Sequence, residues 1–240
     1  MPHLDAMIRK LRKDTGLDDE DLAAIRAMPI HIRDLATNAT IVREGDRPDQ
    51  CCLMVKGFAV RSKMTDQGKR QILSVHIPGD IPDLQSLHLP VMDHDLRTLC
   101  RCTVGFISHE ALKHVTRKRP AVAEALWRET LIDAAMFREW IVNVGRRSAP
   151  QRLAHLLLEL CERLRVVGSC PDGRFQLPMT QVDLADALGL TPVHVNRVLK
   201  ELRTEGLVEM KRSEVPLGDP ARLTAFGDFN PTYLHAAPEL

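Results

Sequence analysis

The side chains best suited to bind another molecule are concentrated between Met179 and Val208. This stretch is MTQVDLADALGLTPVHVNRVLKELRTEGLV. Hydroxyl, amide and imidazole groups can hydrogen-bond to a ligand, and Arg and Lys add positive charge, which is the chemistry needed to contact phosphates and base edges. With two basic residues that follow, the candidates are Thr180, Gln181, Thr191, Val193, His194, Asn196, Arg197, Lys200, Lys211 and Arg212.

Two short helices joined by a tight turn would position these groups. Thr180 is suited to cap the first helix, because a hydroxyl accepts from the free N–H groups of the first turn. Gly189 allows the conformation that ends this helix. Thr191 can cap the second helix, and Pro192 suits its first position, where a missing N–H costs nothing. The second helix has an apolar stripe at three- and four-residue steps, which consists of Val195, Val198, Leu199 and Leu202.

The opposite side of the second helix is polar and basic. At about 100° per residue it carries Val193, Arg197 and Lys200. An ordinary helical hairpin would have the same apolar stripe. The Gly-Leu-Thr-Pro turn and the Arg and Lys on the outward face favour a helix-turn-helix whose second helix enters a DNA major groove. We therefore expect double-stranded DNA as a partner.

The residue types also predict individual contacts. Arg197 is suited to bind O6 and N7 of guanine with two parallel hydrogen bonds. Val193 could touch a thymine methyl group, and His194 a phosphate or a base edge. The remaining basic and hydroxyl residues are interpreted as phosphate contacts, which position a protein without specifying sequence; these are Thr180, Gln181, Lys200, Lys211 and Arg212.

Net charge does not indicate a nucleic-acid partner. The chain has 33 Lys and Arg against 32 Asp and Glu, and residues 151–240 alone hold 10 Lys and Arg against 12 Asp and Glu. DNA binding must therefore depend on the local placement of basic groups. For Lys200 and Arg203 the alternative is a solvated surface that pairs with Glu201 and Glu205, and for Arg203 we favour that alternative.

Composition predicts a cytoplasmic, soluble protein of one large or two modest domains. The chain has 240 residues and is 44% hydrophobic but only 4% aromatic. No apolar run approaches the length needed to cross a bilayer, and the first residues lack the apolar core of a secretory signal.

The six cysteines are expected to be reduced and to serve packing. They form no CxxC pair and no zinc spacing, so we expect no metal site. Cys100 and Cys102 would share one face of a strand, and a redox role for them or for Cys51 and Cys52 is a minority alternative. The six are Cys51, Cys52, Cys100, Cys102, Cys161 and Cys170.

The N-terminal half changes from helical to strand-like. Residues 3–35 are predicted to be helical, with Pro29 ending the run. From Thr40 to Ser108, short β-branched runs alternate with Gly, Pro and Asp, and Asp66-Gln67-Gly68 is typical of a hairpin turn. Several strands at this spacing predict a sandwich or roll.

The helix-turn-helix stretch resembles a known family. Its pattern LxxALGLTxxxVNRxLKxLRxxGLV is similar to the winged helix-turn-helix of the cyclic-AMP receptor/FNR (Crp/Fnr-type) family of bacterial transcription regulators. The series IxxEGD, LxVxGxxV and PGD resembles the cyclic-nucleotide-binding β-roll of the same family, so the resemblance spans nearly the whole chain. It implies a sequence-specific DNA-binding transcription regulator, with a wing formed by Leu207–Arg212 and the residues after it.

The resemblance implies an α+β fold in three parts. These are a cyclic-nucleotide-binding-like β-roll (a double-stranded β-helix or jelly roll) with N-terminal helices at 1–119, a dimerisation helix and hinge at 120–147, and the winged helix-turn-helix domain at 148–240. The helix would pair with its twin in a homodimer, so that two recognition helices, Pro192–Glu205 in each copy, lie about 34 Å apart on a two-fold symmetric site. We expect the tail from Asn230 to Leu240 to be poorly ordered. The dimer interface is predicted to include Leu126, Phe137, Trp140, Ile141 and Val144.

The nucleotide cassette departs from the family pattern. Nucleotide-binding members have a Gly-Glu pair where this chain has Pro82-Asp83, and an Arg-Ser or Arg-Thr pair where it has the acidic run Met92–Asp95. A carboxylate beside a phosphate is repulsive, so we expect no cyclic AMP in the usual pose and no cofactor. The chain has no cysteine before Cys51, which disfavours the iron–sulfur cluster of other members. The degenerate effector pocket would be formed by Gly79, Asp80, Pro82, Asp83 and Arg97.

Two alternatives to a ligand-independent regulator follow from the same fold. One is a signalling module gated by a cyclic nucleotide, another small ligand or redox state. The other is a metal enzyme on the roll, but the strands lack the HxH pair that such enzymes need, and we expect no catalytic activity. If the protein is an activator, RNA polymerase would be an additional partner; no membrane partner is expected.

Overall fold

The computed structural model describes residues 2–12, 15–210 and 213–235. The chain divides into two compact units. Unit 1 is built mainly from Met1–Lys63 and Ser74–Ala134, and unit 2 mainly from Met64–Leu73 and Ala135–Ala236. The boundary between Ala134 and Ala135 lies within one long helix.

Unit 1 begins with a 3-10 turn, η1 (Pro2–Leu4), and two helices, α1 (Asp5–Arg12) and α2 (Asp19–Ala27). A capping box starts α2: the Asp18 carboxylate accepts from the Asp21 N–H at 2.7 Å, and the Asp21 carboxylate accepts from the Asp18 N–H at 3.2 Å. The prediction of helix as far as residue 35 is wrong, because His31–Leu35 form strand β1. After Pro29, the pairing of β1 with the distant strand β7 outweighs the local preference for helix.

In the described part of unit 1 and the adjoining β5, seven strands form two sheets, which confirms the predicted roll. One sheet has the order β1-β7-β3, and the other has the order β2-β6-β4-β5. A turn at Thr65–Lys69 joins β4 to β5, where the Thr65 N–H donates to the Lys69 carbonyl at 2.9 Å, as the Asp-Gln-Gly signal predicts. The strands not yet given are β2 (Thr40–Val42), β3 (Gln50–Lys56), β4 (Ala59–Met64), β5 (Arg70–His76), β6 (Asp95–Thr98) and β7 (Cys102–Ser108).

Strand β3 is buried on both faces and separates two cores. Because successive strand residues point to opposite faces, Cys51 and Leu53 pack with the helices of unit 1, whereas Cys52 and Met54 pack inside the roll. The helical core includes Leu4, Met7, Leu11, Ile25, Leu112 and Val122; the roll core includes Val42, Met92, Leu96, Cys102 and Val104. A short turn, η2 (Leu84–Leu87), closes the first of these cores.

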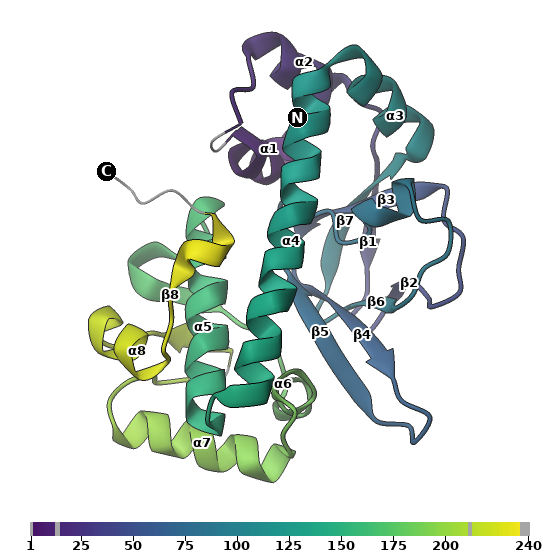
Figure 1. Cartoon of the computed structure of the whole chain (residues 1–240). Helices are drawn as coiled ribbons and strands as arrows, with labels where there is room; N and C mark the ends of the chain where they lie inside the picture. The colour runs from purple at the N-terminus through teal and green to yellow at the C-terminus, as the bar shows by residue number, and fades with distance from the viewer. Residues whose placement is uncertain (1, 13–14, 211–212, 236–240) are drawn as a thin grey trace. The chain divides into compact units, whose positions relative to one another are not determined.

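Two helices follow β7. Ser108 caps α3 (His109–Lys118), since its hydroxyl accepts from the Ala111 N–H at 3.1 Å. Helix α4 (Pro120–Arg146) has 27 residues, and Pro occupies its first position, where no intrahelical N–H is needed. Helices α1, α2 and α3 lie around the first half of α4 (Figure 1).

Unit 2 is organised around α5 (Ala149–Val166), whose apolar side is buried from Leu153 to Leu164. Helix α5 contacts α6, α7, α8, β8 and the last turn, η4. The other elements are η3 (Pro171–Gly173), β8 (Arg174–Gln176), α6 (Gln181–Leu188), α7 (Pro192–Thr204), β9 (Glu214–Pro216), α8 (Pro220–Phe226) and η4 (Pro231–Leu234).

The expectation of a poorly ordered tail is wrong for its first residues. The η4 turn lies beside α5 (Figure 1), and Leu234 is buried. The Tyr233 hydroxyl donates to the Glu159 carboxylate at 2.8 Å. An aromatic side chain that buries its ring and hydrogen-bonds its hydroxyl can order the end of a chain. Residues 236–240 lie outside the described residues.

Replacing Gly79 by Ala should destabilise unit 1 strongly. Gly79 has φ +94, and an added Cβ would lie 2.9 Å from the Ala6 carbonyl carbon of α1. Gly45 is the control, because it has φ +87 but nothing within 4 Å of such a Cβ. We expect Gly45→Ala to lower the free energy of unfolding by about 1 kcal/mol through backbone strain alone. Gly79→Ala should cost about 2–4 kcal/mol because a steric clash is added; equal losses in thermal unfolding would contradict the close approach.

Candidate nucleic-acid interface

Helix α6 has strong local signals at both ends. The Thr180 hydroxyl accepts from the Asp183 N–H at 3.1 Å, and the Asp183 carboxylate accepts from the Thr180 N–H at 2.9 Å, which completes a capping box. Gly189 ends the helix in the left-handed conformation, with φ 65. The turn to the next helix is therefore fixed by backbone geometry, as predicted.

Helix α7 begins at Pro192 and is capped by Thr191, whose hydroxyl accepts from the His194 N–H at 3.2 Å. Val195, Val198 and Leu202 are buried and pack this helix on unit 2. The predicted stripe is confirmed for these three, whereas Leu199 is half-buried. One face of α7 packs against α5 and α6, and the opposite face does not take part in the core of unit 2.

The exposed face of α7 carries the predicted DNA contacts. Val193 is 75% exposed, and Asn196, Arg197 and Lys200 are also exposed. Within the described part of the chain, neither the Arg197 guanidinium nor the Lys200 ammonium has a hydrogen-bond or ion-pair partner. A guanidinium held on a rigid helix without an internal partner is available to a base edge.

The other candidate residues lie around this face with different exposure. Thr180, Gln181 and Thr191 are exposed at the starts of the two helices, and His194 is half-buried. Helix N-termini with exposed N–H and hydroxyl groups suit phosphate contacts. Lys211 and Arg212 lie outside the described residues, so their predicted contacts remain predictions.

A small two-stranded sheet joins the segment before α6 to the segment after α7, where the wing is predicted from Leu207 onward. Strands β8 and β9 pair antiparallel, with Phe175 opposite Val215, and a further bridge joins Val208 to Leu217. Arg203 donates to the Met210 carbonyl at 3.5 Å, so its guanidinium is directed to the loop before β9. This contact supports a structural rather than a base-recognising role for Arg203.

Arg152 on α5 joins the recognition module to its scaffold. Its Nε donates to the Arg147 carbonyl at 2.9 Å, and a terminal nitrogen donates to the Leu188 carbonyl at 3.0 Å. Leu188 is the last residue of α6, where carbonyls lack intrahelical partners. One side chain that sequence reasoning did not single out therefore orients α6 relative to α5.

A buried carboxylate joins three segments of unit 2. Glu159 is 3% exposed, and it accepts from the Trp140 indole N–H at 3.0 Å and from the Tyr233 hydroxyl at 2.8 Å. Burial raises the pKa of Glu159, and the nearby Arg163 opposes that rise. Trp140, predicted at a dimer interface, is thus engaged within its own protomer through its indole N–H.

Helix α4 presents an apolar stripe with coiled-coil spacing. Trp127 (66% exposed), Leu131 (54%) and Ile141 (70%) lie four and ten residues apart, and Val142 (44%) flanks them. This spacing follows the seven-residue repeat of paired helices. Ile141 agrees with the predicted interface, and Phe137 and Val144 are half-buried.

The prediction for Leu126 is wrong. Its side chain is 5% exposed and belongs to the helical core of unit 1, so it offers no surface to a second copy. Trp127, which is next to Leu126 and two seven-residue repeats before Ile141, points outward instead. Leu131 was missed, although its four-residue separation from Trp127 is the signal that identifies it.

The interior of the roll holds a buried ion pair that sequence reasoning also missed. Arg61 on β4 is 5% exposed; its Nε and one terminal nitrogen donate to the Pro82 carbonyl, the Nε at 2.8 Å. The other terminal nitrogen binds the Asp133 carboxylate of α4 at 2.6 Å. Asp133, which interrupts the apolar band of α4, thereby compensates a charge inside the roll.

The predicted effector-pocket residues lie mostly in internal contacts. Asp80 is 4% exposed and accepts from Lys10 at 2.8 Å, and Asp83 is 1% exposed and accepts from the Cys52 N–H at 2.7 Å. Gly79 makes the close approach to α1 described above, and Pro82 supplies its carbonyl to Arg61. Arg97 is directed away from this group: its side chain is 43% exposed and pairs with Asp95 on its own strand.

Burial also sets the protonation of the interior. Desolvation raises the pKa of Asp83 to about 7. Desolvation, and then the Arg61 charge, lower the pKa of His76 to about 4, so this histidine is neutral near pH 7. Its Nε2 lies 2.8 Å from the Ser74 hydroxyl and its Nδ1 3.3 Å from Asp80.

The cysteines lie in two kinds of environment. Burial raises the pKa of Cys51 to about 12, which keeps its thiol unreactive near neutral pH. Cys100 does not share a strand face with Cys102, since β7 begins at Cys102. The neighbouring Cys102 side chain, whose thiol donates to the Cys100 carbonyl at 3.2 Å, lowers the pKa of Cys100.

No group of three or more His, Cys, Asp or Glu residues is arranged to hold a metal ion in the described ranges. Likewise, among the residues whose structure is given, no helix has the length and apolar character to cross a bilayer.

A β-roll, a long helix with an exposed apolar stripe and a winged helix-turn-helix define a class of DNA-binding regulators. Comparison with protein families agrees with this assignment. The model of the Crp-like helix-turn-helix domain matches residues 151–226, and that of the cyclic nucleotide-binding domain matches residues 32–119.

Relatives and solved structures extend the match over most of the chain. The transcriptional activator protein FnrL of Cereibacter sphaeroides is 28% identical over 227 residues, covering 91% of this chain and 89% of that protein. The nitrogen fixation regulation protein FixK of Bradyrhizobium diazoefficiens is 26% identical over 223 residues, covering 92% of each. The structure of FixK2 from Bradyrhizobium japonicum has a TM-score of 0.76 at 25% identity, covering 83% of this chain and 98% of that chain. The chain carries a Crp-like helix-turn-helix domain and a cyclic nucleotide-binding domain, and like its Crp/Fnr-type relatives it is a DNA-binding transcription regulator.

Substituting Asp83 by Asn should remove a pH dependence of stability. In the unfolded chain the carboxyl ionises near 3.8, whereas in the folded chain it resists ionisation until about 7. Between these values the folded state binds more protons, so stability is lost as the pH rises. From about pH 5.5 to 7.5 the wild type should lose about 2 kcal/mol of unfolding free energy relative to Asp83→Asn. The unfolding free energies of both proteins are measured by urea denaturation at several pH values. If they change with pH in the same way, the burial of the Asp83 carboxyl is contradicted.

Proposed function

We propose that the protein binds DNA as a homodimer and recognises a two-fold symmetric site with helix α7 in the major groove. The observation that carries this proposal is the exposed Arg197 guanidinium, which has no partner among the described residues and lies on a capped, well-packed helix. Arg197 would bind a guanine and Val193 a thymine methyl group. Asn196 and Lys200 flank them on the same exposed face.

The exposed stripe on α4 supports the homodimer. Trp127, Leu131 and Ile141 would be costly to leave in water on a helix, and their spacing suits pairing with an identical helix. A single recognition helix contacts only half of a palindromic site. The stripe therefore accounts for how two half-sites could be bound together.

We further propose that DNA binding does not require a cyclic nucleotide in the usual pose. Arg61 is already bound by Pro82 and Asp133, and Asp80 and Asp83 place carboxyl groups in the cassette. A ligand phosphate would have to displace a buried ion pair and approach these acids. Gating by a cyclic nucleotide, another ligand or redox state remains the alternative, and the arrangement of the interior favours it less.

The remaining functional assignments follow from this role. Relatives of the chain are named as transcriptional activators and regulators, and we propose that this protein likewise acts on transcription without catalysing a reaction. Its DNA partner places it in the cytoplasm, where bacterial DNA resides. RNA polymerase would be a further partner if the protein activates transcription, as the FnrL name states for that relative.

Arg197→Ala should weaken binding to the specific site by about 1–3 kcal/mol and leave binding to random duplexes nearly unchanged. The guanidinium would be lost from a base edge rather than from a phosphate. Lys200→Ala is the matched control, because losing a phosphate contact should weaken both kinds of DNA alike and reduce the salt slope by about one. Fluorescence anisotropy at several salt concentrations measures both effects. Equal loss on both DNAs for Arg197→Ala would exclude base recognition.

Leu131→Glu should convert the protein to a monomer at micromolar concentration. Each copy would bury the carboxylate of the introduced Glu without a partner in the interface, and this destabilises the dimer by several kcal/mol. Leu89→Glu is a control of the same chemistry, because Leu89 is 59% exposed in a loop and Leu131 is 54% exposed on the stripe. Sedimentation equilibrium gives the association state of each variant. A Leu131→Glu protein that remains dimeric would show that the interface lies elsewhere.

A further inference from the structure

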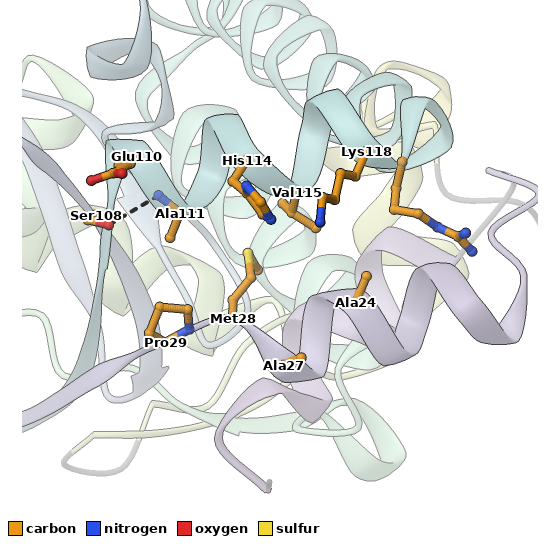
Figure 2. Close-up of a pocket in the computed structure, with 11 residues that line it drawn as sticks. Ala24, Ala27, Met28, Pro29, Ser108, Glu110, Ala111, His114, Val115 and Lys118 are labelled. Atoms are coloured by element: carbon orange, nitrogen blue, oxygen red, sulfur yellow. Dashed lines mark hydrogen bonds between the residues drawn. The ribbon is translucent and has the colours of Figure 1, made fainter.

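A groove on unit 1 between α2 and α3 is not used by any role described so far. Its volume is about 540 Å³, within the range of ligand-binding pockets. Figure 2 shows residues of α2 and the segment after it facing residues of α3 across this space. The groove lies wholly within unit 1 and involves neither the roll interior nor helix α7.

The groove has an apolar floor. Met28 and Val115 are buried at its base, both 5% exposed, and Ala24, Ala27 and Ala111 line it with small side chains. Small residues on both facing helices leave space that larger side chains would fill. The floor can therefore accept an apolar group from another molecule.

One end of the groove is held closed by ion pairs. Arg119 binds Asp18 at 3.0 Å, Glu20 at 2.7 Å and Asp21 at 2.7 Å, which joins the end of α3 to the start of α2. Ser108, at the other end, is engaged as the cap of α3, shown as the dashed line in Figure 2. The space between the helices is therefore fixed by contacts within the protein.

The rim formed by α3 is basic. Lys113, His114, Arg117 and Lys118 are exposed, and in the described ranges their side chains make no hydrogen bond or ion pair. A second hollow of about 490 Å³ adjoins the first and is lined by these four residues and Glu110. The two hollows share Glu110, His114 and Lys118.

We propose that this groove docks an acidic peptide segment of a partner protein, with an apolar side chain on the floor and carboxylates against Lys113, Arg117 and Lys118. Charge complementarity specifies the acidic character of the occupant. An apolar hollow beside a basic one suits a chain with both kinds of side chain better than a small molecule that would fill only one. This docking surface is separate from the DNA interface and does not depend on it.

Selection from a displayed library of random peptides, on the full-length protein, tests the proposal. We expect enriched peptides in which Asp or Glu flank Leu or Phe. The strongest is then synthesised with a fluorescent label and compared with a counterpart in which each Asp and Glu is replaced by Asn and Gln. Binding should fall at least about ten-fold for that counterpart, as expected when complementary charges are removed.

Three variants locate the binding site. Ala27→Trp places a large side chain into the apolar hollow, and Lys118→Glu reverses the charge at the shared rim; each should weaken peptide binding at least about ten-fold. Lys56→Glu, an exposed lysine at the end of β3, is the matched charge control and should bind as the wild type does. All three should retain wild-type affinity for duplex DNA, which reports that they are folded.

Several outcomes would overturn the proposal. The first is enrichment of peptides without acidic residues. The second is that Ala27→Trp and Lys118→Glu bind the peptide as tightly as the wild type does. The third is that Lys56→Glu loses as much peptide affinity as these two variants. Saturable binding of decanoate, abolished by Ala27→Trp while no peptide binds, would assign the groove to small amphipathic carboxylates instead. Loss of random-duplex affinity in Lys118→Glu, again with no peptide bound, would assign the basic rim to nucleic acid.

Discussion

The buried guanidinium of Arg61 is the constraint on which unit 1 depends most. A charge at this depth is tolerated only when its donors are satisfied. The Pro82 carbonyl and the Asp133 carboxylate provide that satisfaction, from the loop after β5 and from helix α4 respectively. One side chain thereby joins the loop after β5 and the first half of α4 to the roll.

In unit 2, capping and turn residues that are close together in the sequence fix the conformation of the recognition helix. Capping boxes and hydroxyl caps start α6 and α7, and Gly189 sets the turn between them. Arg152 then joins α6 to α5, and Glu159 binds α5 to Trp140 and to Tyr233 near the chain end. The result is a helix whose buried face is fixed and whose opposite face presents Arg197 to solvent. Because residues 151–240 hold 10 Lys and Arg against 12 Asp and Glu, DNA binding must depend on the local placement of basic groups on this helix.

The same distinction explains what could be predicted from the sequence. The helix-turn-helix was predictable because its caps, its glycine and its apolar stripe all lie within one short stretch of sequence, from Thr180 to Leu202. Arg61 was not, because an arginine in a strand gives no local sign of burial, and its partner Asp133 is 72 residues away. Strand β1 and the η4 turn likewise depend on distant partners, β7 and α5. Leu126 shows the limit of periodicity on a long helix, where an error of one residue exchanges the inner face for the outer one.

Selection of duplexes from a random DNA pool, with purified full-length protein and no added ligand, tests the central claim most directly. We expect enrichment of a two-fold symmetric site whose half-sites are separated by about one helical turn, since paired α4 helices would place two α7 helices on one side of the duplex. No enrichment even at low salt, followed by enrichment when cyclic AMP is added, would contradict it. That result would mean that the interior around Arg61 and Asp83 opens to a nucleotide after all.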